Sequence, residues 1–228
     1  MNPLVIPPGL AILARGDGWA VVVKPAGLRS VPGRAEDATD SVQTRIQTVF
    51  PKADGAITPH RLDVETSGLM VVALNRRILR GLARQFEKRK IGKAYQGVLA
   101  GEIEAEKGVI ELPLRVDWPN RPRQMVCHEQ GKASRTLWRV LNRAPGRTHV
   151  EFRPETGRTH QLRVHAVTPV AEGGLGAPIL GDTLYGDPDS APRLHLHATR
   201  LSFFDPVLGV PMRFNSPPPF EIGSDPGG

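Results

Sequence analysis

Short apolar runs bounded by turn residues predict the first strands of this chain. Residues 19–23, Trp-Ala-Val-Val-Val, form one run, and the Lys-Pro-Ala-Gly sequence that follows stops it. Residues 67–74 form a second run, which is entered from a polar stretch. Strands buried on both faces are continuous apolar runs of this length, so we predict two buried strands.

Apolar residues at helical spacing predict three helices. The first is expected to have Asp40 as its N-cap and to end at Pro51, with an apolar face of Val42, Ile46, Val49 and Phe50. The second spans residues 76–90 and carries the apolar stripe Ile78, Leu79, Leu82 and Phe86. The third is expected from about residue 159 to 167, with Thr159 as a possible cap.

After residue 93 the pattern changes to strands separated by Gly, Pro and Asn turns. The expected strands are residues 94–100, 109–114, 134–141, 148–152, 194–204 and 211–215. Many strands with few, irregularly placed helices predict an α+β fold, with a mostly antiparallel mixed sheet and flanking helices. Residues 171–176 are expected to be a flexible surface loop. The domain is expected to span residues 18–220, between an N-terminal extension (1–17) and a disordered tail (221–228).

Composition favours a water-soluble protein with a polyanionic partner. The 228 residues are 39% hydrophobic, and no apolar run approaches the roughly 20 residues that cross a bilayer. The N-terminus lacks the features of a secretory signal, and a single cysteine excludes an internal disulfide, so a cytoplasmic location is expected. The formal net charge is +7 and the pI about 10.1. This excess of cations favours RNA or DNA phosphates, although a merely charged surface is the alternative.

Seven cations gather on or near the second predicted helix: Arg76, Arg77, Arg80, Arg84, Lys88, Arg89 and Lys90. A solvated helix face, with cations favoured toward its C-terminal end, is one interpretation. Contacts with a phosphate backbone are the other, and the acidic motif that lies a short distance upstream favours them.

That motif, His-Arg-Leu-Asp-Val-Glu-Thr-Ser-Gly, occupies residues 60–68. Most aspartates in turns are caps or solvated groups. Asp63, however, lies near two basic residues, Arg61 and His60, and just before a predicted buried strand. An opposite charge nearby favours the ionised form of a carboxylate, and an ionised carboxylate can serve as a nucleophile or a base.

Two further segments carry polar groups next to predicted strands or helices. Residues 93–101, Lys-Ala-Tyr-Gln-Gly-Val-Leu-Ala-Gly, place Tyr95 in a strand, where a half-buried aromatic role is the simpler interpretation. Residues 156–165, Thr-Gly-Arg-Thr-His-Gln-Leu-Arg-Val-His, contain two histidines. Their spacing of five is poor for one helix face, and no cysteine or carboxylate completes a ligand set, so we expect no metal site.

All three segments resemble the signature motifs of the RluA-type pseudouridine synthases. Residues 24–28, with the Lys-Pro-x-Gly turn, and residues 179–186, with Leu-Gly-Asp-x-x-Tyr-Gly, also match. The resemblance runs from about residue 18 to 220 and is greatest to the short RluA branch, which shares residues 30–34 and 117–122. One departure is Gly-Ala-Pro at 176–178, where the family has Gly-His-Pro, preceded by extra residues from 169 to 175.

The resemblance implies a role for each candidate residue. Asp63 is the catalytic residue, Arg158 forms a salt bridge with it, and Tyr95 packs on the target base and can act as a base. Arg61 holds or replaces the flipped nucleotide, and Leu162 lines the pocket. His60 and His160 are counted among the substrate-binding residues. Asp182 is more readily explained by a turn than by catalysis.

The resemblance also implies a pseudouridine synthase domain with a central RNA-binding cleft. The enzyme cuts the N1–C1′ bond of a uridine, rotates the uracil and rejoins it through C5. It needs no metal or other cofactor and works as a monomer. Its RNA substrates are expected to be 23S ribosomal RNA, the tRNA anticodon stem-loop, or both. Two alternatives remain open: a catalytically inactive RNA-binding protein of the same fold, and an unrelated hydrolase that uses Asp63 and His60.

Overall fold

The computed structural model describes residues 4–6, 9–33, 35 and 38–221, and it divides the chain into two compact units. Unit 1 comprises Met1–Lys93 and Ala198–Pro217, and unit 2 comprises Ala94–His197 and Pro218–Gly228. Each unit contains helices and antiparallel strands, so the predicted α+β fold is confirmed. The expected disordered tail lies outside the described residues, except for Glu221.

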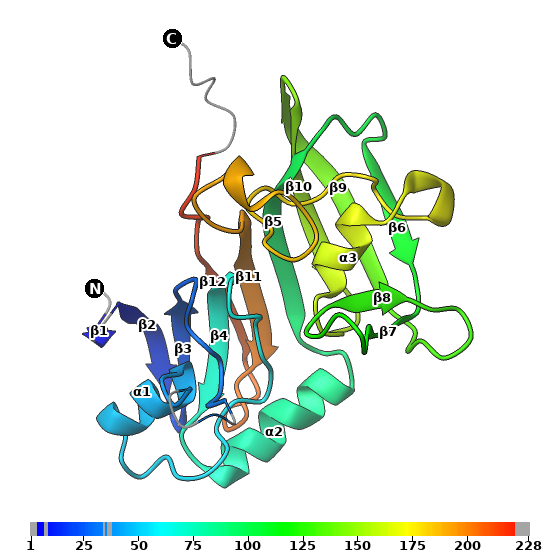
Figure 1. The fold of residues 1–228 in the computed structure, drawn as a ribbon. Coiled ribbons are helices and arrows are strands. Elements are labelled where there is room, and N and C mark those ends of the chain that lie inside the picture. Colours follow the sequence, from blue (N-terminus) through cyan, green and yellow to red (C-terminus); the bar gives the residue numbers. More distant parts are fainter. Residues whose placement is uncertain (1–3, 7–8, 34, 36–37, 222–228) are drawn as a thin grey trace. The chain divides into compact units, whose positions relative to one another are not determined.

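Unit 1 is built on a sheet whose strands pair mostly antiparallel. Its strands are β1 (Leu4–Ile6), β2 (Leu10–Gly16), β3 (Trp19–Lys24), β4 (Ser67–Ala73), most of β11 (Leu196–Phe204), and β12 (Pro211–Asn215). They follow the order β1-β2-β3-β4-β11, and β12 pairs with β11 (Figure 1). Both predicted apolar runs form strands: β3 pairs with β4 from Trp19 opposite Ala73 to Lys24 opposite Gly68. Strands β1 and β2 were not predicted.

The core of unit 1 explains why the runs 19–23 in β3 and 69–73 in β4 are continuously apolar. One sheet face packs Trp19, Val21, Leu69 and Val71 against helix α2 (Arg76–Glu87), which contributes Ile78 and Leu82. The residues between them in β4, Met70 and Val72, point to the other face and are also buried. A strand covered on both faces loses the polar–apolar alternation, as the apolar runs predicted.

Both helices of unit 1 differ slightly from the prediction: the cap of the first lies one residue later, and the second ends three residues earlier. Helix α1 (Val42–Val49) has Ser41 as its N-cap, in a capping box with Thr44, while Asp40 pairs with Arg45 (2.6 Å). Val42 and Ile46 are buried as expected, but Val49 is 38% exposed. Helix α2 is capped by the Asn75 side chain and ends at Glu87, before the basic residues 88–90.

Unit 2 contains most of the remaining strands. They are β5 (Gly92–Ala100), β6 (Lys107–Glu111), β7 (Leu114–Val116), β8 (Gln124–Val126), β9 (Arg135–Ala144) and β10 (Arg147–Pro154). Four pair antiparallel in the order β5-β10-β9-β6, and β7 and β8 form a separate hairpin (Figure 1). The strand predicted over residues 109–114 is thus divided between β6 and β7.

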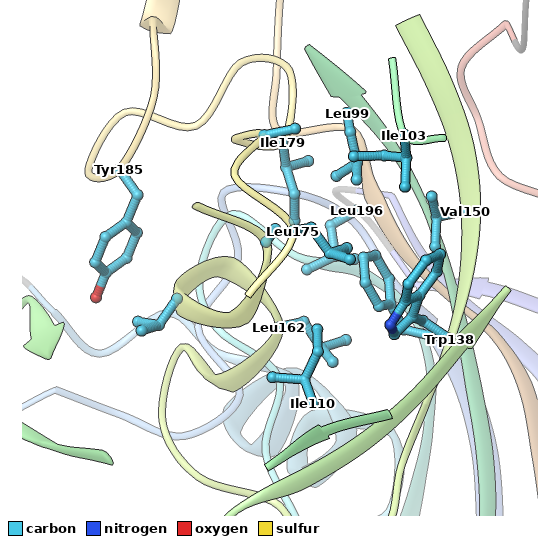
Figure 2. Packing of buried hydrophobic residues seen from close by; sticks show 14 of the residues in the cluster. Leu99, Ile103, Ile110, Trp138, Val150, Leu162, Leu175, Ile179, Tyr185 and Leu196 are labelled. Carbon is cyan, nitrogen blue, oxygen red and sulfur yellow. The ribbon is translucent and has the colours of Figure 1, made fainter. Parts of the chain in front are cut away.

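Helix α3 (Gln161–Val167) packs its apolar residues into the core of unit 2, which Figure 2 shows. It begins two residues later than predicted. Its N-cap is His160 in the left-handed conformation, and Thr159 does not cap it. Its C-terminal carbonyls are bonded by residues 175–177: the amides of Leu175, Gly176 and Ala177 donate to the carbonyls of His165, Thr168 and Ala166.

The segment expected to be a flexible surface loop is therefore in part fixed to α3. A short 3₁₀ helix (Val170–Glu172) turns the chain, and Leu175 is buried in the core. A Cβ on Gly174 would lie about 2.1 Å from the Thr168 carbonyl oxygen, so the backbones approach closely there. The glycines that suggested flexibility permit this close packing instead.

Candidate active site

Asp63 lies in the loop that leads into β4, and a buried lysine from another segment anchors this loop. Lys24, the last residue of β3, is fully buried. Its ammonium donates to three carbonyl oxygens, those of Pro25 (2.9 Å), Leu28 (2.7 Å) and Val64 (2.9 Å). A buried charge needs such hydrogen bonds to offset its lost hydration. Lys24 thereby ties the residue after Asp63 to the turn at 25–28.

Ser30 anchors the residue before Asp63. Its hydroxyl donates to the Leu62 carbonyl (2.7 Å) and accepts from the Leu62 amide (3.0 Å). The backbone amide of Gly27 also donates to the Val64 carbonyl (2.9 Å), and Gly27 has a φ of +83°, which glycine adopts without strain. Asp63 is thus half-buried between two neighbours whose backbones are both fixed.

His60 joins the same loop to the strand and helix behind it. Its Nε2 accepts the Val71 amide hydrogen (3.1 Å), and its ring stacks on Phe86 of α2 with centroids 4.6 Å apart. Burial, aided by the charge of Lys93, lowers the pKa of His60 to about 3. A neutral imidazole whose Nε2 is already engaged is a poor general base. This geometry argues against the hydrolase that would use His60.

Gly68 ends the motif for a packing reason. Its φ is +118°, and a Cβ there would lie 2.5 Å from backbone atoms of Ala198 in β11. Only glycine lets the two strands approach this closely at that conformation. The residue therefore fixes β4 in its sheet.

Arg158 lies in unit 2, just before α3, and its side chain is exposed. Its Nε donates to the Ala133 carbonyl (3.1 Å), and its amide donates to the side chain of Gln161 (3.0 Å). The Gln161 amide group in turn donates to the Arg135 carbonyl (3.1 Å) and the Thr136 hydroxyl (2.9 Å). Within the described part of unit 2, neither terminal nitrogen of Arg158 has a hydrogen-bond partner, so both can bind an oxyanion.

The other candidates of unit 2 have distinct surroundings. Tyr95 is half-buried in β5 opposite Phe152 and packs on the core, as expected of a strand tyrosine. Leu162 is buried in that core, on α3 (Figure 2). His160 is buried, and its Nδ1 lies 2.8 Å from the Tyr185 hydroxyl.

Asp182 forms a structural ion pair. Both its oxygens bind Arg163, at 2.8 Å to Nε and 2.5 Å to Nη2, and both residues are buried. Asp182 also accepts the backbone amides of Leu184 and Tyr185, each at 3.0 Å. The carboxylate is buried and engaged in these bonds, so the turn role expected from sequence is confirmed.

The candidates divide between the units: His60, Arg61 and Asp63 lie in unit 1, and Tyr95, Arg158, His160 and Leu162 lie in unit 2. The expected ion pair between Asp63 and Arg158 therefore stays a prediction. Lys24, Ser30 and Gln161, which hold Asp63 and Arg158, were not predicted to act on the site. Lys24 and Ser30 belong to segments noted only for their resemblance to the family, and Gln161 lies in its third motif.

The described residues offer neither a cluster of metal ligands nor a helix suited to a membrane. No group of three or more His, Cys, Asp or Glu side chains among them could hold a metal ion. No helix in the described part of the chain is long and apolar enough to cross a membrane.

Comparison with known proteins decides the family. The family described as RNA pseudouridylate synthase matches residues 18–167. The chain belongs to this family. The dual-specificity RNA pseudouridine synthase RluA of Escherichia coli K12 is 46% identical over 217 residues, covering 93% of this chain and 95% of that protein. RluA of Yersinia pestis is 48% identical over 198 residues, with 85% and 92% covered.

Solved structures agree with this assignment. Human RNA pseudouridylate synthase domain containing 1 superposes with a TM-score of 0.75 at 31% identity, covering 97% of this chain and 88% of that one. Human RNA pseudouridylate synthase domain containing 4 gives a TM-score of 0.70 at 26% identity, with 91% and 88% covered. The protein is thus an RNA pseudouridine synthase, an isomerase that acts on RNA.

Proposed function

We propose that Asp63 is the catalytic residue of this synthase. The observation that supports it most is the anchoring of its loop: Lys24 binds the carbonyl on one side of Asp63 and Ser30 binds the residue on the other. A catalytic group must be held in a fixed position relative to the reacting atoms. The Asp63 carboxylate, half-buried at the start of β4, has that support.

The remaining candidates take complementary roles in this proposal. The Arg158 guanidinium keeps the Asp63 carboxylate ionised and oriented, since its terminal nitrogens suit a carboxylate. Tyr95 packs on the uracil and assists removal of the C5 proton. The exposed Arg61 holds the flipped conformation of the nucleotide. Leu162 closes the apolar side of the pocket, while His60 and His160 support the substrate-binding segments.

We propose ribosomal RNA and tRNA as the substrates. The E. coli and Yersinia relatives are named dual-specificity enzymes and are 46% and 48% identical to this chain. The basic face of α2 would contact the phosphates of either RNA, since its cations are exposed. We also propose that the enzyme needs no cofactor, because the isomerisation requires neither an oxidant nor an energy source. A cytoplasmic location and a monomeric state complete the proposal.

Tritium release from RNA labelled at C5 of uridine tests the assignment. Isomerisation frees the C5 hydrogen, so the assay needs no knowledge of the modified position. We expect the Asp63→Asn variant to release no tritium. The same variant should bind RNA about as tightly as the wild type. The control is Asp54→Asn, which removes an exposed carboxylate from the same unit and should release tritium at the wild-type rate.

The outcomes separate the alternatives. Substantial turnover by Asp63→Asn would exclude Asp63 as the catalytic residue. Tight RNA binding without release by the wild type, on both ribosomal RNA and tRNA lacking pseudouridine, would favour an inactive RNA-binding protein.

A further inference from the structure

The loop that joins β7 to β8 in unit 2 is closed by hydrogen bonds and is basic. Three backbone hydrogen bonds close it. The amide of Asp117 donates to the carbonyl of Arg123 (3.0 Å), that of Asn120 to Asp117 (3.1 Å), and that of Arg123 to Asn120 (3.0 Å). The Asn120 side chain also donates to the Asp117 carboxylate (3.0 Å), the hairpin's single acidic group. Three arginines accompany it between residues 114 and 126.

This loop displays an aromatic side chain that the core does not use. Trp118 is 60% exposed, whereas the two other tryptophans, Trp19 and Trp138, are 2% and 8% exposed. The Arg121 guanidinium lies 4.7 Å from the centre of the Trp118 ring. A cation on a tryptophan ring orients it through the ring's quadrupole. An exposed indole fixed this way costs little conformational entropy when it meets a ligand.

The hairpin is connected to the segment that contains Arg158 and Leu162. The backbone amide of Gln124 donates to the Tyr185 hydroxyl (2.6 Å). This hydroxyl lies 2.8 Å from His160 Nδ1. His160 is the N-cap of α3, and α3 contacts β8. Figure 2 shows Tyr185 with its hydroxyl directed away from the labelled aliphatic side chains of the core. These bonds fix the loop relative to the candidate residues on and before α3.

We propose that Trp118 stacks on an unpaired base of the RNA substrate, outside the target uridine, with Arg121 and Arg123 binding the adjoining phosphates. Tryptophan offers a flat apolar face to any base, and the surrounding arginines match the charge of the backbone. A protein partner would not require this excess of cations. The inference rests on the proposed action on structured RNA, and it names a contact that would help to select the substrate.

Intrinsic fluorescence can test the contact without measuring catalysis, because Trp118 is the only solvent-exposed tryptophan of the three. The probe is an unmodified tRNA transcript, whose loops contain unpaired bases, and heparin serves as a polyanion without bases. We expect the transcript to quench the emission and to protect it from acrylamide, heparin to do neither, and the Trp118→Phe variant to lose the response. Equal responses to heparin and tRNA, or tRNA binding with unchanged emission, would overturn the proposal.

Steady-state tritium release gives a second readout. Loss of one stacked base is worth about 5- to 150-fold in affinity, so Trp118→Ala should raise the KM for RNA within this range, and Trp118→Phe should restore most of it. The control, Leu208→Ala, removes another exposed apolar side chain and should keep the wild-type KM. An unchanged KM in Trp118→Ala would contradict this inference, whereas an inactive wild type would instead contradict the proposed substrates.

Discussion

At the scale of single residues, polar groups hidden from solvent position the candidate catalytic loop. Lys24 and Ser30 lie in or after β3, yet they bind the residues on either side of Asp63. Their burial makes them costly to remove, because each carbonyl that loses its donor remains without a hydrogen bond. They act on Asp63 through the backbone and are therefore positioning residues.

Replacement of Lys24 tests this role. We expect Lys24→Met to lower the free energy of unfolding by about 2–4 kcal/mol, because carbonyl oxygens lose their donor. In addition, kcat should fall at least about tenfold with little change in the KM for RNA, since geometry during the chemical step is lost while RNA contacts remain. Urea denaturation and tritium release at 15 °C, where the variant stays folded, would measure the two effects.

The exposed Lys52 provides the matched control, and Lys52→Met should change neither quantity. A folded Lys24→Met protein with the wild-type kcat would show that the loop holds Asp63 without this lysine.

At the scale of elements, α2 has two faces with different tasks. Ile78 and Leu82 pack into the core of unit 1, while the cations on and after the helix are exposed. Across the described residues, none of the seven cations at 76–90 has an acidic partner. In unit 2, by contrast, several arginines form ion pairs, among them Arg135, Arg139, Arg143, Arg153 and Arg163. Unpaired cations on one face are suited to bind phosphates.

Neutralising this face should weaken RNA binding in a salt-dependent way. We expect the triple variant Arg77→Gln, Arg80→Gln, Arg84→Gln to bind RNA less tightly and to reduce the slope of log K against log salt by up to about 3, since each phosphate contact contributes roughly one. Filter binding between 50 and 300 mM KCl would measure the slope.

A control variant with the same loss of charge, Arg15→Gln, Lys52→Gln, Arg147→Gln, removes scattered exposed cations. It should leave the slope near the wild-type value. Equal slopes in the two triple variants would indicate that α2 contributes only general charge, which is the solvated-face interpretation of this helix.

At the scale of the whole molecule, buried histidines link folding to pH. Burial lowers the pKa of His149 and of His165 to about 4, and burial with the charge of Lys93 lowers that of His60 to about 3. In the unfolded chain a histidine titrates near pH 6.5. The unfolded state therefore binds more protons than the folded state below that pH, and acid favours unfolding.

Stability should accordingly fall as the pH is lowered. We expect the free energy of unfolding to be nearly constant above pH 7 and to decrease from about pH 6.5 toward pH 4, with each histidine contributing up to about 1.4 kcal/mol per pH unit. Urea titrations at pH 7.5, 6, 5 and 4.5 would measure this. His165→Gln should flatten the curve, whereas substitution of the exposed His128 should not. A stability independent of pH over this range would contradict the shifted pKa values.

The local pattern of residues determined several elements of this protein. The apolar runs specified β3 and β4, because a strand covered on both faces does not alternate polar with apolar residues. The stripe on α2 specified the face that packs in unit 1, and β12 occurs over the residues predicted. The motifs specified the family, since residue types at fixed spacing are properties of the chain itself.

Tertiary structure alone decided how the candidate residues are held. Lys24 and Val64 are 40 positions apart, and Ser30 and Leu62 are 32 apart, so no local periodicity connects them. Ser41, not Asp40, caps α1, because the cap depends on which side chain reaches the Thr44 amide. The segment near Gly174 packs closely on α3, although its glycines predicted a flexible loop. Glycine permits both a flexible loop and a close backbone approach, and only the neighbouring residues in the fold determine which one occurs.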